Sequence, residues 1–133
     1  MTWNIVLIAA AASLIATATA NAKSAVEPAA GTKPARQCFW THQVTNFASS
    51  DSRIVNLRVG VKDIYQLEMF GRCNDVDWTQ KIAVVSRGGS NICSGLDAEI
   101  IAPSTLGPQR CPVRTVRKLT VEEVKALPKR ARP

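Results

Sequence analysis

The sequence predicts a mainly β fold, a small antiparallel barrel or curled sheet of five to six strands with one short C-terminal helix and two disulfides. Three observations support this prediction. Short runs of alternating apolar and polar residues recur between turn-forming residues, which is typical of strands buried on one face. Four cysteines stand far apart in the chain. One helix signal occurs, at residues 119–124, near the C-terminus.

The first 22 residues indicate a cleavable signal peptide. Residues 5–20 are an almost unbroken run of apolar and small side chains, and the run ends in Ala20-Asn21-Ala22, the small-x-small pattern that signal peptidase recognises. A run of about 16 residues is short for a membrane span, which takes about 20. We therefore expect a periplasmic protein that is exported by this signal and has no transmembrane span in its mature form.

Three segments are expected after the signal. Residues 23–37 contain mostly Ala, Pro, Gly and Lys, so they predict a flexible leader. Large apolar residues begin at Cys38-Phe39-Trp40, and residues 38–127 are expected to form a single disulfide-stabilised β domain. Residues 128–133 are expected to be a basic tail.

Two β-hairpins are expected in the first part of this domain. Residues 53–59 and 64–70 alternate and flank a short turn at residues 60–63, so they predict the first hairpin. Residues 81–86 and 91–94 flank a turn with paired glycines, Arg87-Gly88-Gly89-Ser90, and predict the second. The apolar face of the first hairpin is expected to contain Val55, Leu57, Val59, Tyr65, Leu67 and Met69.

Two further strands and the helix complete the prediction. Residues 98–102 are expected to form a strand that Pro103 ends, and residues 112–117 another, whose Pro112 implies a strand start or an edge. Thr120 and Glu123 have the spacing of a capping box, and Pro128 stops the helix after about two turns. A helix this short must pack its apolar side chains against the sheet. These side chains are Val121, Val124 and Leu127.

The cysteine spacing favours structural disulfides. Cys38, Cys73, Cys93 and Cys111 contain no C-x-x-C pair, which argues against a zinc site and against a thioredoxin-type redox site. In an exported protein two disulfides are expected. Four cysteines allow three pairings, and the sequence does not choose among them.

The charge of the chain points to an anionic partner. The formal net charge is +7, and basic residues are concentrated from Arg110 onward. Outside the cytoplasm such a region meets anionic lipid headgroups, cell-wall polymers or acidic proteins, and no nucleic acid is expected. The alternative is a solvated face that only keeps the protein soluble. The candidate contact residues are Arg114, Arg117, Lys118, Lys129, Arg130 and Arg132.

No catalytic, cofactor or metal site is predicted. His42 is the single histidine, and no Ser or Cys near it has the context of a nucleophile. The stretch Asn74-Asp75-Val76-Asp77-Trp78 resembles the start of a calcium loop but lacks the next ligand, so a turn is the simpler interpretation. The glycines of residues 86–90 could cradle an anion, yet a hairpin turn explains them.

Several short motifs together resemble a family of small exported proteins of Gram-negative bacteria that is described only as a domain of unknown function. The resemblance covers about residues 37–127 and includes the cysteine framework and the C-terminal Leu-Thr-x-x-Glu box. It implies a periplasmic or cell-envelope protein and brings no activity with it. The motifs are Cys38-Phe39-Trp40, Tyr65-Gln66-Leu67, Gly71-Arg72-Cys73, Asp77-Trp78, Ser86-Arg87-Gly88-Gly89, Ile92-Cys93 and Leu119-Thr120-Val121-Glu122-Glu123.

Two functional hypotheses follow. The first is a non-enzymatic binding or structural module of the envelope, in which the disulfides fix a β scaffold and the basic region engages an anionic component or protein. The second is an inhibitor or regulator of an envelope enzyme that presents the connection between Cys93 and Cys111 as a recognition loop, or an enzyme whose site the sequence does not reveal. The oligomeric state is left open.

Overall fold

The computed structural model describes residues 37–133, which belong to a single compact unit. The predicted signal peptide and all of the predicted leader except Gln37 lie outside the described residues. The described part contains eight strands. They are β1 (Phe39–Trp40), β2 (Val44–Asp51), β3 (Ile54–Val59), β4 (Asp63–Met69), β5 (Ala83–Ser86), β6 (Asn91–Ile92), β7 (Ala98–Ser104) and β8 (Gly107–Lys118).

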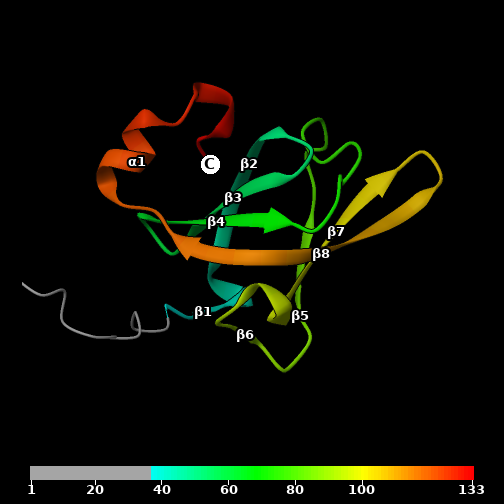
Figure 1. Cartoon of the computed structure of the whole chain (residues 1–133), viewed down its shortest axis with the longest axis horizontal. Coiled ribbons are helices and arrows are strands. Elements are labelled where there is room, and N and C mark those ends of the chain that lie inside the picture. The colour runs from blue at the N-terminus through cyan, green and yellow to red at the C-terminus, as the bar shows by residue number, and fades with distance from the viewer. Residues whose placement is uncertain (1–36) are drawn as a thin grey trace, which may run out of the picture. The chain divides into compact units, whose positions relative to one another are not determined.

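The main sheet is antiparallel and six-stranded, with the order β2-β3-β4-β8-β7-β5. It curls into a half-barrel, and β1 and β6 form a separate two-stranded sheet (Figure 1). The described helices are α1 (Val121–Ala126) and three short 3-10 turns, η1 (Thr41–Gln43), η2 (Gly95–Asp97) and η3 (Lys129–Ala131). The predicted mainly β fold with one short C-terminal α-helix is therefore confirmed.

The first predicted hairpin is confirmed. β3 and β4 pair in register from Ile54 opposite Glu68 to Val59 opposite Asp63. The predicted apolar face forms the centre of the core, since Leu57 and Leu67 are fully buried there. The Tyr65 ring packs at 4.7 Å between centroids against the ring of Phe39.

The second predicted hairpin is wrong. β5 pairs with β7 along the main sheet, while β6 pairs with β1. A disulfide joins Cys93, next to β6, to Cys38, next to β1, and buries Ile92 and Phe39 as a plug in the core. The glycine turn at residues 87–90 redirects the chain, but this cross-link and the burial of two large side chains decide which strand β6 joins.

β7 and β8 are longer than predicted and run through their prolines. Pro103 lies within β7 and pairs with Pro108. Pro112 lies inside β8, and its carbonyl accepts a hydrogen bond from the Phe70 N–H, beyond the end of β4. The nitrogen of Pro112 therefore faces the side where β4 has already ended, so the absent N–H costs no bond of the ladder.

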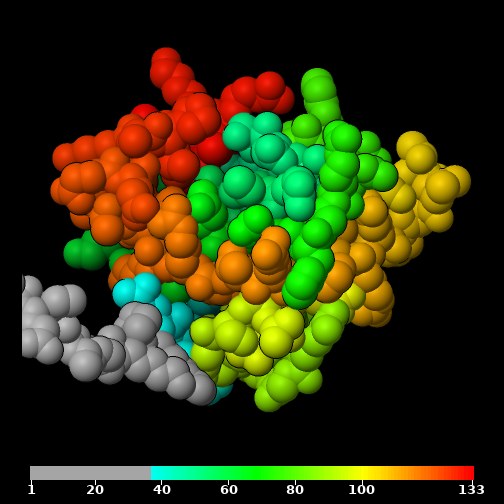
Figure 2. Space-filling view, viewed as in Figure 1, coloured from blue at the N-terminus to red at the C-terminus, as the bar shows by residue number. Residues whose placement is uncertain are grey.

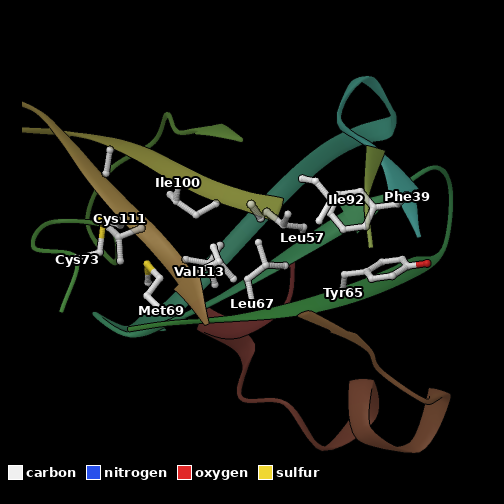
Figure 3. Packing of buried hydrophobic residues seen from close by; sticks show 14 of the residues in the cluster. Phe39, Leu57, Tyr65, Leu67, Met69, Cys73, Ile92, Ile100, Cys111 and Val113 are labelled. Carbon is white, nitrogen blue, oxygen red and sulfur yellow. A yellow bond between two sulfur atoms is a disulfide. The ribbon is translucent and has the colours of Figure 1, made fainter. Parts of the chain in front are cut away.

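The two disulfides close opposite ends of the core. Cys38 pairs with Cys93 and Cys73 pairs with Cys111, which resolves the three possible pairings. Figure 3 shows Cys73 and Cys111 beside Met69 at one end of the buried cluster, and the Phe39 and Ile92 plug at the other. The Cys38–Cys93 bridge reinforces the pairing of β1 with β6, and the Cys73–Cys111 bridge ties the segment after β4 to β8.

The predicted helix and its capping box are confirmed, but its packing differs. The Glu123 N–H donates to the Thr120 hydroxyl, and the Glu123 carboxylate accepts from the Thr120 N–H. Val121, expected against the sheet, is 63% exposed. The segment after Pro128 also packs on the sheet, because Ala131 of the expected basic tail is buried and η3 contacts β2.

A row of polar side chains on three neighbouring strands holds this C-terminal segment. Asn56 of β3, Gln66 of β4 and Arg117 of β8 are register neighbours. Gln66 donates to Asn56 at 3.2 Å and accepts from Arg117 at 2.8 Å. At the two ends of the row, Arg117 bonds the Glu123 carboxylate at 2.6 Å, and Asn56 donates to the carbonyl of Ala131 at 2.8 Å. We call these residues the outer polar row.

Asn56→Ala is expected to lower the free energy of unfolding by about 2 kcal/mol, because it leaves the buried Ala131 carbonyl without its donor. The released segment should also be cut faster by trypsin after Lys129 and Arg130. Chemical denaturation and timed proteolysis measure both effects. Asn46→Ala is the matched control, since Asn46 is exposed and its side chain bonds only the adjacent Phe47 N–H. Equal proteolysis of both variants would contradict the holding role of the row.

Candidate functional site

A groove opens where the β3–β4 turn meets the start of α1. It has a volume of about 630 Å³, and we call it the lysine groove. Two bonds bring its distant segments together, one from the Leu119 N–H to the carbonyl of Ile64 and one between Lys118 and Asp63. Figure 2 shows the surrounding orange and red segment after β8 gathered on one side of the domain. The groove is lined by Lys62, Asp63, Lys118, Leu119, Thr120, Val121, Val124 and Lys125.

The walls of the groove are apolar, and its charge is positive. Of its apolar lining residues, Leu119 is buried, Val124 is half-buried and Val121 is exposed. Three lysines and a single carboxylate line it. Such a combination suits an anionic ligand that also carries an apolar part.

Lys118 is the one groove lysine with an ion pair among the described residues. Its ammonium lies 2.9 Å from the Asp63 carboxylate. The hydrogen bond to Asp63 raises the pKa of Lys118, so this side chain stays charged throughout the physiological range. Lys62 and Lys125 are exposed and form no ion pair within residues 37–133. Their charges are free to meet an anion.

The helix that forms one wall is fixed by charge as well as by its cap. The bond from the Thr120 N–H and the neighbouring Arg117 guanidinium lower the pKa of the Glu123 carboxyl. Glu123 is therefore ionised at neutral pH and accepts from both partners at once. The outer polar row thus positions α1, and through α1 it positions Val121 and Val124.

The six predicted contact residues do not form one site in the structure. Arg117 is used in the outer polar row, and Arg132 donates to the carbonyls of Leu127 and Lys125. Arg130 lies over the ring of Trp78, with its guanidinium carbon 5.7 Å from the ring centroid. Arg114 and Lys129 are exposed, on β8 and in η3 respectively. Of the six, Lys118 alone lines the groove.

Two lysines of the groove, Lys62 and Lys125, are absent from the six contact residues predicted from the sequence. Lys62 lies in the β3–β4 turn, where a polar residue is expected and does not indicate a binding site. Lys125 belongs to the basic C-terminal region, but it is not one of the six candidate contact residues. The signal that could have found Lys62 is the neighbouring Val61, an apolar residue in a turn, which is 91% exposed in the structure.

The other segments considered from sequence lie elsewhere. His42 is exposed in η1, and Asp75 of the turn at residues 74–78 has a left-handed backbone with φ of 64°. The segment from Cys93 to Cys111, considered as a recognition loop, is η2, β7 and part of β8. Its exposed end is the short turn that contains Leu106.

Helices of membrane-spanning length and apolarity do not occur within residues 37–133. Fold and site together define a disulfide-linked β half-barrel whose C-terminal segment builds a lysine-rimmed apolar groove. The chain belongs to the Family of unknown function (DUF6491), whose model matches residues 1–133. This confirms the resemblance to a domain of unknown function. Neither the curated proteins nor the solved structures contain a significant match to the chain.

Proposed function

We propose that the protein is an exported, non-enzymatic binding module of the cell envelope and that its lysine groove holds an anionic component of that envelope. The observation that carries the proposal is the groove itself. It brings together Lys62, Lys118 and Lys125 around apolar walls, with Asp63 as the one carboxylate in its lining.

Three further features support this proposal. Both disulfides are of the kind that persists in oxidising compartments, which fits the expected export to the periplasm. The formal net charge of +7 favours association with anionic surfaces over distances up to the Debye length. The outer polar row holds the groove in place, so little ordering is required on binding.

The test is sedimentation of the purified protein with lipid vesicles as a model anionic surface. We expect binding to vesicles that contain phosphatidylglycerol and none to pure phosphatidylcholine vesicles. Lys62→Gln combined with Lys125→Gln should weaken binding about 30-fold, since each lysine near an anionic surface contributes about 1 kcal/mol. Added salt should weaken the wild-type binding further.

The matched control is Arg53→Gln combined with Lys81→Gln. It removes the same number of positive charges from exposed positions that do not line the groove. We expect this control to bind within a few-fold of wild type. If both double variants lost the same affinity, binding would follow net charge alone and the groove would not be the site. If the wild type ignored anionic vesicles, the proposed function would be wrong.

A further inference from the structure

The lysine groove has two chemically different parts, and they indicate more than a site for an anion. Leu119, Val121 and Val124 supply an apolar surface, which a free anion such as phosphate would not use. Lys62 and Lys125 stand among the groove residues without an ion pair in the described chain. A ligand that uses both parts carries a negative charge at the end of an apolar chain.

The surroundings of the groove repeat this division. Val61 beside Lys62 is 91% exposed, and Val121 is 63% exposed. Both are apolar side chains held in water next to lysines, and both belong to segments that meet at the groove. Exposed apolar side chains beside basic ones are typical of proteins that rest at a lipid surface, where the apolar part enters the acyl region and the lysines meet phosphates.

We propose that the groove takes an acyl chain of an anionic phospholipid, with the apolar walls contacting the chain and Lys62 and Lys125 contacting the headgroup phosphate. This inference rests on the proposed function and names the ligand class for the same site. Lys118 adds a third charge that Asp63 holds in a fixed position. Val61 and Val121 then lie at the surface of the bilayer on either side of the bound lipid.

Alkyl phosphates of increasing chain length test the inference, each used below its micelle concentration in calorimetric titrations. We expect affinity to rise with chain length, by up to about fourfold for each methylene that becomes buried, until the groove is full. Inorganic phosphate should bind far more weakly than decyl phosphate. Val124→Thr and Val121→Thr keep the side-chain shape but should reduce the dependence on chain length. Val121→Thr changes an exposed position, so it leaves folding intact.

Two results would overturn the inference. Equal affinity for hexyl phosphate, decyl phosphate and inorganic phosphate would show a site for anions without a place for the chain. Equal affinity for decyl phosphate and a neutral decyl glycoside would show an apolar site in which the lysines play no part. The first result leaves the proposed function standing if vesicle binding still depends on Lys62 and Lys125. If vesicle binding no longer depended on Lys62 and Lys125, the proposed function itself would fail, whatever the alkyl phosphates show.

Discussion

Replacing Cys38 and Cys93 by serine is expected to lower the free energy of unfolding by about 4 kcal/mol. The bridge spans a sequence separation of 55 residues, and closing a loop of this length restricts the unfolded chain by about that amount. For a domain of this size, such a loss is a large share of the total stability, which is about 5 to 15 kcal/mol. Denaturant titration under non-reducing conditions measures it.

The structure also indicates where this loss would appear. The bridge holds β1 beside β6, and these strands insert the buried Phe39 and Ile92 into one end of the core. The control compares the double variant with wild type after full reduction, when the two should have nearly equal stability. Losing a disulfide usually costs more than about 1 kcal/mol. If, without reductant, the free energy of unfolding of the variant were within about 1 kcal/mol of the wild-type value, the structural role of the bridge would be contradicted.

Gly95→Ala is the second change with a large expected effect, a loss of about 3 kcal/mol or more. Gly95 is buried in η2, and a Cβ atom there would overlap the carbonyl of Arg114 and the nitrogen of Thr115. Both atoms belong to the backbone of β8, at the point where its register with β4 shifts. A flexible side chain could move aside, but a backbone in the middle of the sheet cannot do so without breaking ladder bonds.

Thermal and chemical denaturation measure the effect of Gly95→Ala. Gly88→Ala is the matched control, because Gly88 is exposed and a Cβ atom there would meet nothing within 4 Å. We expect the control to unfold within about 1 kcal/mol of wild type. Equal stability of the two variants would mean that η2 can shift away from β8. Since Ser94 and Cys93 both bond the Asp97 carboxylate, such a shift would also disturb the neighbouring Cys38–Cys93 bridge.

The parts of the fold that depend on local alternation could be predicted from the sequence. The first hairpin follows from the period of β3 and β4, and the helix start follows from Thr120 and Glu123. The partner of β6 could not be predicted, because the turn at residues 87–90 carries no information about which strand Cys93 is joined to. The bridge to Cys38 and the burial of Phe39 and Ile92 decide it, and both depend on residues far apart in the sequence.

The lysine groove was beyond sequence reasoning for a similar reason. The sequence indicates the basic region from Arg110 onward, but it does not indicate which of its side chains bond to other parts of the protein. Arg117 is an internal partner of Glu123, and Lys118 is a groove residue, although the two are adjacent in sequence. Lys62 reaches the site because β4 pairs with β8 and carries the β3–β4 turn to the start of α1. Long-range pairing of strands, rather than local charge density, thus selects the residues of the site.

The most direct test of the central claim is hydrogen exchange of the purified protein with and without phosphatidylglycerol vesicles. The account predicts slower exchange of the amides in residues 60–63 and 118–126 on binding, with no change at the β7–β8 turn around Leu106. Slower exchange confined to that turn or to residues 74–78, with the groove unaffected, would contradict it and place the binding surface elsewhere on the domain.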